Sequence, residues 1–562
     1  MPAISQLPFP RERLHPRHLK RHANPLAIFP PELQAEAKKH IYLREYLRAL
    51  PVDVIGVPQY YAEVSRKLKK LSRRNLIYPV GKQGIYIHLY PDPLAERDQY
   101  VAIEPSLLVE LDDLMRQVDI KLLEWAEVIG QAPEEKRPDE FLKALDCVCT
   151  LRPGPNNGQL HVTPLEHAAI RYQTLRDKIG LGALEPLIQD SQIEDISCSG
   201  VGSIFIEHKI FGSLQTSVVF PELDDLDDFV VWLGERIKRP VTLRRPIVDA
   251  VLPDGSRVNI VYGRDIAKRG SNFTIRKFAD DPLSIISLLG FGSMDYDMAA
   301  YLWLVIEEGL NVFVVGPTAS GKTTLLNALT TFILPDAKVV SIEDTPELQV
   351  PHKNWIREVV REMGQSERGA SVGMFDLLRA ALRQRPDRIM IGEIRGVEGN
   401  IAFQAMQTGH GVMATFHAAS VQKLIQRLTG DPINVPKPNI DNLDVVVIQM
   451  AVRGPDGSTV RRVVSINEIV DYDPVSNSFS FNTSFRWRSD SDTFEFPGDK
   501  NSYVLEEKIA RKRGLGESEK RGIYAELRKR ARILERLHKR TKVDGFAKLF
   551  QILVEAQKQG LI

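Results

Sequence analysis

Cysteine is scarce in this sequence, and neither sign of charge is in excess. Three cysteines among 562 residues are too few for a disulfide framework or for a four-cysteine zinc site. Lysine and arginine number 74 and aspartate and glutamate 73, so the net charge gives no argument for a nucleic-acid partner. Any basic surface that binds a partner must therefore be local.

Long hydrophobic runs are also missing. The longest stretch without Asp, Glu, Lys or Arg, residues 399–422, is interrupted by amides, histidines and glycines, whereas a membrane-spanning helix needs ~20 mostly apolar residues. The start of the chain contains Pro, Arg and His where a secretory leader would have a charged and then an apolar segment. We therefore expect a soluble protein without a secretory signal.

The length of the chain predicts about three to four domains. A Pro/Gly/Asn-rich linker at 153–158 and the Asp-Asp-Pro sequence at 280–282 indicate where two of them end. We expect a flexible basic arm over residues 1–30, a small N-terminal domain over 31–152, an α+β domain over 160–280, a core domain over 290–480, and a mostly helical C-terminal extension over 481–562.

Two basic clusters precede the α+β domain. One lies in the arm, at positions 11–21, and the other at 66–74, on a segment whose apolar residues have helical spacing. A solvated helix face is the simpler interpretation of the second cluster. The alternative is a docking surface for an acidic protein or for lipid headgroups.

The α+β domain carries two arginines in unusual places. Short strands are predicted at 203–207, 216–220, 257–261 and 272–275, with an amphipathic helix at 226–237. Arg257 and Arg276 lie within or at the end of these strands instead of on loops. Each arginine taken alone is still more simply interpreted as a surface charge.

A phosphate-binding loop opens the core domain. The apolar run 312–315 predicts a buried strand, and the pattern Gly-x-x-x-x-Gly-Lys-Thr that follows it is a Walker A loop leading into a helix at 324–332. Its glycines let backbone N–H groups approach phosphate oxygens, its lysine supplies a point charge, and its threonine is expected to hold Mg²⁺. The predicted nucleotide-binding residues are Gly316, Pro317, Thr318, Ala319, Ser320, Gly321, Lys322, Thr323 and Thr324.

Two further predicted strands end in glutamates. Residues 338–342 lead to Glu343, and residues 388–391 lead to Glu393. In an open parallel α/β sheet the carboxyl ends of the strands share one edge, so both should converge on the Walker loop. One carboxylate should reach Mg²⁺, for which we expect Glu393 together with Thr323, and one should activate the attacking water. The sequence leaves open which glutamate is the base.

Two histidines, His410 and His417, bracket the next predicted strand, 411–414. A lone histidine is more often a packed or surface residue, and a metal would want further ligands that the sequence does not offer. An imidazole near the γ-phosphate can donate a hydrogen bond that is present with ATP and absent with ADP. We therefore predict that both histidines sense the γ-phosphate, with structural packing as the alternative.

Four stretches of the core domain resemble one family, the secretion-superfamily hexameric ATPases of type II and type IV secretion, type IV pili and the archaeal flagellum. They are the Walker A loop, the acidic box Ile342-Glu-Asp-Thr-Pro-Glu347, the Walker B sequence Ile389-Met-Ile-Gly-Glu-Ile-Arg395, and the histidine box Thr408-Gly-His-Gly-Val-Met-Ala-Thr-Phe-His417. The resemblance covers roughly residues 165–475, and the tail at 501–507 looks most like the archaeal branch. One departure is Ala319, where the family usually has glycine.

The resemblance implies a RecA-like P-loop motor domain of the α/β class, preceded by an α+β (PAS-like) domain. It implies ATP and Mg²⁺ as cofactors, a homohexamer, and an integral-membrane platform protein as partner, at the cytoplasmic face of the cell membrane. It also implies that Arg257 and Arg276 reach the γ-phosphate and couple the nucleotide state to domain closure. The basic N-terminal clusters are then candidates for contact with the membrane surface.

The expected function is ATP hydrolysis that powers assembly of a type IV pilus-like filament or protein secretion. One alternative is a ring ATPase that translocates nucleic acid, as in conjugation, for which binding should be sensitive to salt. The other is a nucleotide-gated scaffold with a decayed site, for which Ala319 is the only support. Nucleic acid is the less expected partner, because the basic face at 528–540 has no interleaved aromatic residues.

Overall fold

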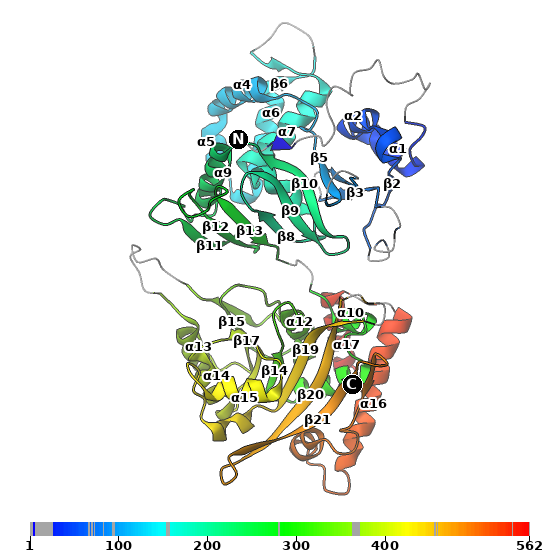
Figure 1. Cartoon of the computed structure of the whole chain (residues 1–562), viewed down its shortest axis with the longest axis vertical. Coiled ribbons are helices and arrows are strands. Elements are labelled where there is room, and N and C mark those ends of the chain that lie inside the picture. The colour runs from blue at the N-terminus through cyan, green and yellow to red at the C-terminus, as the bar shows by residue number, and fades with distance from the viewer. Residues whose placement is uncertain are drawn as a thin grey trace. The chain divides into compact units, whose positions relative to one another are not determined.

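The computed structural model describes residues 4–5, 26–65, 68, 71, 74–81, 84–92, 96–152, 158–278, 282–361, 371–454, 457, 459–541, 543 and 545–560. The chain divides into two compact units, Met1–Ala279 and Asp280–Ile562 (Figure 1). Nearly all of the basic arm at 1–30 and of the basic cluster at 66–74 lies outside the described residues. In the second cluster Arg74 is described, and it pairs with Asp98 at 3.2 Å.

The first unit is built on one eleven-stranded sheet. Its order is β11-β12-β13-β8-β9-β10-β5-β4-β3-β2, and β1 pairs with β10 outside this path. The strands are β1 Ile4–Ser5, β2 Gln59–Tyr60, β3 Leu76–Val80, β4 Ile85–Tyr90, β5 Gln99–Ile103, β8 Ile193–Cys198, β9 Gly202–His208, β10 Gly212–Phe220, β11 Ile247–Val251, β12 Arg257–Val261 and β13 Asn272–Arg276.

This sheet joins two ranges that the sequence analysis placed in separate domains. Strand β5 belongs to the range 31–152 and β10 to the range 160–280, yet they hydrogen-bond in parallel, with Gln215 opposite Gln99. Buried residues of both ranges, such as Ile87 and Ile206, pack in one core. The structure therefore corrects the expected division, because shared backbone pairing and a shared core make the two ranges one unit.

Helices cover the first sheet on both faces. Along β4 the side chains alternate, so that Ile87 faces one core while Tyr86 faces a second core that includes α1 and α2. Helix α7 begins with a capping box between Thr163 and Glu166. The helices are α1 Pro31–Lys39, α2 Ile41–Ala49, α3 Val52–Ile55, α4 Asp112–Leu122, α5 Ala126–Gln131, α6 Arg137–Val148, α7 Pro164–Lys178, α8 Glu185–Gln189 and α9 Leu223–Arg236, and the short strands β6 Cys149–Thr150 and β7 Leu160–His161 pair with each other.

The second unit contains a nine-stranded sheet whose order is β16-β15-β17-β18-β14-β19-β20-β21-β22. The six strands from β16 to β19 are parallel, and β20, β21 and β22 continue the sheet antiparallel. This arrangement is the α/β class predicted for the motor domain. The strands are β14 Val312–Val315, β15 Val339–Glu343, β16 Trp355–Val359, β17 Arg388–Ile394, β18 Gly411–Phe416, β19 Val445–Arg453, β20 Thr459–Asp473, β21 Ser478–Arg488 and β22 Thr493–Glu495.

Two layers of helices enclose the central strand β14. Its side chains alternate between them, since Val312 and Val314 face one core while Phe313 and Val315 face the other. The first core includes α11, α12, α16 and α17, and the second includes α13, α14 and α15 (Figure 1). The helices are α10 Ile285–Gly290, α11 Tyr296–Glu307, α12 Lys322–Leu329, α13 Met374–Arg383, α14 Glu398–Gln407, α15 Val421–Thr429, α16 Ile523–Arg536 and α17 Phe546–Lys558, with shorter turns η7 Thr330–Phe332, η8 Lys437–Asn442, η9 Val504–Ala510, η10 Lys520–Gly522 and η11 Leu537–Thr541.

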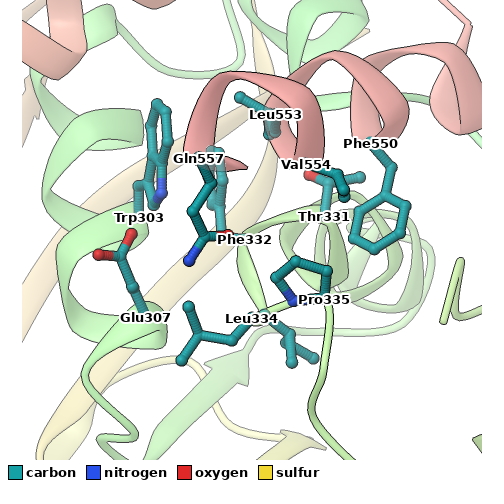
Figure 2. Close-up of a pocket in the computed structure, with 11 residues that line it drawn as sticks. Trp303, Glu307, Thr331, Phe332, Leu334, Pro335, Phe550, Leu553, Val554 and Gln557 are labelled. Carbon is teal, nitrogen blue, oxygen red and sulfur yellow. The ribbon is translucent and has the colours of Figure 1, made fainter. Parts of the chain in front are cut away.

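The C-terminal residues complete the core of the second unit. Leu527 of α16 and Leu549 of α17 are buried in the same cluster as Val312 of the central strand. Figure 2 shows a small pocket where α17 meets α11, η7 and the residues after η7, with Trp303 and Gln557 among its lining residues. Residues 481–562, expected to form a mostly helical extension, therefore include strands β21 and β22 and belong to the motor domain's own core.

A buried carboxylate fastens this C-terminal segment to the sheet. Glu468 of β20 is fully buried, and its Oε1 accepts hydrogen bonds from the hydroxyls of Tyr301 at 2.8 Å and Ser502 at 2.5 Å. Its Oε2 accepts from the backbone N–H groups of Tyr503 at 2.8 Å and Val504 at 3.3 Å. The stretch 501–507, which resembles the archaeal branch of the family, is thus joined to β20 through one carboxylate.

Glu468→Ala should lower the free energy of unfolding by about 3 kcal/mol or more, because it leaves several buried donors without an acceptor. Denaturant unfolding followed by circular dichroism measures the loss. Glu495→Ala, which removes a half-exposed partner of Arg488, is the control and should cost less than about 1 kcal/mol. Equal effects of the two substitutions would show that Glu468 does not anchor the segment.

Within the described residues, no helix is long and apolar enough to cross a membrane.

Candidate active site

The phosphate loop has the local geometry that the Walker A pattern predicts. It follows β14 and leads into α12, whose first residue is Lys322 and whose preceding Gly321 has φ +91°. A Cβ on Gly316 would lie 2.1 Å from the carbonyl oxygen of Gln449, so only glycine fits there. Pro317, Thr318 and Ala319 are exposed at the apex, Ser320 is buried, and Thr323 and Thr324 are half-buried on the first turn of α12.

The apex contains a residue in a left-handed conformation. Ala319, where the family usually has glycine, has φ +59°. An alanine pays on the order of 1–2 kcal/mol for this conformation, whereas glycine adopts it freely. The loop thus holds an alanine in a conformation that the family's usual glycine would adopt without this cost.

The ammonium group of Lys322 faces the interior of the loop. It donates a hydrogen bond to the carbonyl oxygen of Pro317 at 3.0 Å and lies 3.5 Å from Nε2 of His417. Burial lowers the pKa of Lys322, and the nearby Glu393 carboxylate opposes that change. His417 follows β18 directly, so strand pairing between β14 and β18 brings its imidazole to the loop.

Glu343 ends β15 and is almost completely buried, with 1% of the residue exposed. Its Oε1 accepts hydrogen bonds from the backbone N–H groups of Glu347 at 2.7 Å and Leu348 at 2.6 Å. Its Oε2 has no hydrogen-bond partner among the described residues and lies 3.6 Å from Nε of Arg357. Burial raises the pKa of Glu343 to about 7, against the two N–H groups and the Arg357 guanidinium, which lower it.

Glu393 lies near the end of the adjacent strand β17. Its Oε2 accepts a hydrogen bond from Arg395, and its Oε1 lies 3.3 Å from Nε2 of His417. That distance suits an ion pair, but the groups lack hydrogen-bond geometry, and Oε1 has no other partner in the described part of the chain. The preceding Gly392 packs against the side chain of Glu343, since a Cβ there would lie 3.2 Å from its Cγ. The two glutamates therefore lie close together at the carboxyl ends of the adjacent strands β15 and β17.

This constellation suits a magnesium ion bound with a nucleotide. Glu343 Oε2 and Glu393 Oε1 are two buried carboxylate oxygens that accept no hydrogen bond from the residues the structure describes, and they are hard donors of the kind that Mg²⁺ prefers. The Thr323 hydroxyl follows Lys322 at the start of α12, where a P-loop supplies its metal ligand. The residues present thus fit the ion, which would take its remaining ligands from water and phosphate.

The structure corrects the expected position of His410. This histidine precedes β18, whose first residue, Gly411, pairs with Arg388 at the start of β17, whereas His417 follows the last residue of β18. Seven residues of nearly extended chain span about 23 Å, so His410 lies at the opposite edge of the parallel sheet from the phosphate loop. Its Nδ1 lies 3.0 Å from the Thr408 hydroxyl, which is a structural contact at the end of α14.

Arg257 and Arg276 are neighbours in the first unit. They sit directly opposite each other on β12 and β13, and both are exposed. Arg257 pairs with Asp249 through two hydrogen bonds, and Arg276 donates to Asp195 at 3.2 Å. Two guanidinium groups therefore share one strand register and are held in place by carboxylates on the flanking strands.

Other residues at the site were not predicted or were given less weight. Arg357 and Arg395 contact Glu343 and Glu393 respectively. Arg461 of β20 donates a hydrogen bond to the carbonyl oxygen of Ala319 at 3.2 Å and was missed altogether. No local pattern marks it, because the contact joins residues 142 positions apart.

The sequence profile of the family described as "Type II/IV secretion system protein" matches residues 177–485, which is more than half of the chain. The chain belongs to this family. The match includes the phosphate loop, both glutamates, both histidines and both arginines of the first unit. Membership confirms the resemblance that the motifs indicated, and it supports ATPase activity and a role as a secretion motor.

Several relatives extend the similarity. Protein MJ0900 of Methanocaldococcus jannaschii is 44% identical over 531 residues, which cover 92% of this chain and 95% of that protein. The type IV secretion system protein PtlH of Bordetella pertussis is 33% identical over 271 residues, 44% of this chain and 79% of its own. The solved structure of the Legionella pneumophila ATPase DotB aligns at 21% identity over 52% of this chain and 81% of its own, with a TM-score of 0.38.

Proposed function

We propose that this protein is a Mg²⁺-dependent ATPase whose hydrolysis cycle powers assembly of a type IV pilus-like filament or protein secretion. The observation that carries this proposal is the convergence of Lys322, Glu343, Glu393 and His417 on one phosphate loop. A cation and two partly unsatisfied carboxylates at that place suit a triphosphate, a metal ion and an attacking water. Family membership is consistent with this chemistry.

Lys322 and the backbone N–H groups of residues 316–324 bind the β- and γ-phosphates in this proposal. Thr323 and Glu393 hold Mg²⁺, which when bound supplies positive charge against the charge that develops during phosphoryl transfer. Glu393 suits this task because Arg395 fixes one of its oxygens and leaves the other directed to the site.

Glu343 is the better candidate for the general base. One oxygen is fixed by two backbone N–H groups, so the other is rigidly placed, and it has no hydrogen-bond partner among the described residues. A pKa of about 7 matches the requirement that a base be mostly ionised near neutral pH and still accept a proton. Burial and geometry therefore support Glu343 for the role of base, which the sequence left open between the two glutamates.

His417 and the pair Arg257 and Arg276 are the proposed sensors of the γ-phosphate in the hydrolysis cycle. The imidazole of His417 lies within reach of both Lys322 and Glu393, so a bound γ-phosphate would change its contacts. Arg257 and Arg276 are proposed to approach the γ-phosphate when the first unit closes on a motor domain, as the family resemblance implies. Their carboxylate partners would then be exchanged for phosphate oxygens.

We further propose that the protein works as a homohexamer at the cytoplasmic face of the cell membrane, with an integral-membrane platform protein as partner. The basic N-terminal clusters at 11–21 and 66–74 are the proposed contacts with anionic headgroups.

Phosphate release from ATP by the purified full-length chain, with and without Mg²⁺, tests the central proposal. We expect turnover that is lost on chelation of Mg²⁺ and raised by anionic vesicles carrying the platform protein. Double-stranded DNA should neither bind in a salt-dependent manner nor stimulate hydrolysis, and DNA-stimulated turnover would favour the nucleic-acid translocase instead. Absence of any hydrolysis would leave the decayed scaffold as the better account.

A further inference from the structure

Arg461 connects the antiparallel part of the motor sheet to the apex of the phosphate loop. It lies on β20, opposite Ala451 of β19. Its Nε donates a hydrogen bond to the carbonyl oxygen of Ala319 at 3.2 Å, and its Cδ would lie 3.1 Å from a Cβ placed on Gly321. One side chain therefore covers both residues of the loop that have positive φ, Ala319 at +59° and Gly321 at +91°.

Gly321 and Ala319 differ in how readily each adopts a positive φ. Glycine adopts a positive φ about as readily as a negative one, so Gly321 needs no outside support. Ala319 carries a Cβ, which disfavours this conformation, so an isolated loop would tend to leave it. A hydrogen bond to the Ala319 carbonyl oxygen fixes the peptide plane that follows this residue and opposes that change.

The adjacent residue, Arg462, fixes the strand that carries Arg461. Arg462 is buried, pairs with both carboxylate oxygens of Asp492 at 2.9 and 2.8 Å, and donates to the carbonyl oxygen of Phe291 at 3.1 Å. These bonds fix the strand on one side, and Arg461, the residue before Arg462, is exposed and contacts the phosphate loop. In the described part of the chain Arg461 forms no ion pair with a carboxylate, so its charge is not directed elsewhere.

We propose that Arg461 is a positioning residue for nucleotide binding, which acts by holding the apex of the phosphate loop in the left-handed conformation at Ala319. The inference rests on the proposed function, because it concerns affinity for MgATP at the same loop. Backbone N–H groups bind phosphate oxygens only when the loop already has the required turn. Pre-organisation of that turn raises affinity without any new contact to the ligand.

The first test measures MgATP binding with a fluorescent ATP analogue. Arg461→Ala should weaken binding about tenfold, which corresponds to about 1.4 kcal/mol, while kcat at saturating ATP stays within about twofold of the unsubstituted protein. Arg461→Lys, which keeps a donor without the guanidinium geometry, should restore part of the affinity. Arg453→Ala removes an exposed arginine from the neighbouring strand β19 and should leave affinity unchanged.

The second test combines Arg461→Ala with Ala319→Gly. If the arginine acts through the conformation of Ala319, glycine at this position makes the support less necessary, and the affinity loss from Arg461→Ala should shrink from about tenfold to about twofold. An undiminished tenfold loss in the glycine background would show that the guanidinium binds the phosphates directly, and would overturn the proposal. So would unchanged affinity in Arg461→Ala itself.

The outcomes separate this inference from the proposed function. If the unsubstituted protein binds MgATP and Lys322→Ala does not, the site assignment stands whatever Arg461→Ala does. If the unsubstituted protein binds no nucleotide, both proposals fall together. Unfolding midpoints of all variants are compared, since a shift for Arg461→Ala beyond that of Arg453→Ala would indicate a structural role and contradict the positioning role.

Discussion

Lys322→Ala should abolish ATP hydrolysis, with a fall in kcat/KM of at least about a hundredfold to a thousandfold. The side chain is nearly buried at the start of α12, and its ammonium lies beside His417 and within the field of Glu393. Removing it takes away the cation that offsets charge on the transferring phosphoryl group. Phosphate release at several ATP concentrations separates the loss in kcat from the loss in affinity.

A matched control is available in the same sheet. Lys423 also occupies the first turn of a helix that follows a parallel strand, but it is exposed, and in the described residues its ammonium donates a hydrogen bond only to Gln426. Lys423→Ala should keep full activity. If Lys322→Ala hydrolyses ATP at the rate of the unsubstituted protein, the loop at 316–324 is not the active site.

Glu343→Gln should lower kcat by about 10²–10⁴, the range attributed to general acid–base catalysis, while leaving MgATP affinity largely intact. The amide oxygen can still accept the N–H groups of Glu347 and Leu348, so the turn is kept. What is lost is the second carboxylate oxygen, which alone can take a proton from water. Single-turnover measurements at saturating ATP detect the change.

The pH dependence gives an independent test of the same assignment. Burial raises the pKa of Glu343 to about 7, so the active, ionised form is lost as the pH falls through 7. The kcat/KM of the unsubstituted protein should therefore rise between pH 6 and pH 8 and level off above it, and this limb should vanish in Glu343→Gln. Glu358→Gln, on the adjacent strand β16, should leave the profile unchanged. An acid limb that persists in Glu343→Gln would transfer the role of base to Glu393.

Local patterns predicted the parts of the molecule that local patterns determine. The strands at 312–315 and 257–261 have the bounds that the sequence pattern indicated. The rule that parallel strands end at one edge predicted that Glu343 and Glu393 lie near each other, and in the structure Gly392, beside Glu393, packs against the Glu343 side chain while Glu393 lies beside His417. The same rule applied strictly would have excluded His410, because that residue precedes its strand instead of following it.

Pairings between segments that are distant in the chain could not be predicted from the sequence. The sequence of β10 is compatible with pairing to several strands, and nothing in its composition indicates that it pairs with β5. The contact of Arg461 with Ala319 and the role of Glu468 likewise depend on side chains that meet only after the sheet forms. A single sequence shows which residues are apolar or charged, whereas contacts between distant residues are determined by the topology of the folded sheet.

The continuous sheet of the first unit has a mechanical consequence. A displacement applied at the edge formed by β2, β3 and β4 passes through hydrogen-bonded backbone to β12 and β13 near the opposite edge, where Arg257 and Arg276 lie. Two junctions on this path, β10 with β5 and β2 with β3, are parallel and have two residue pairs each in register, so we expect shear to separate the layer at these junctions first.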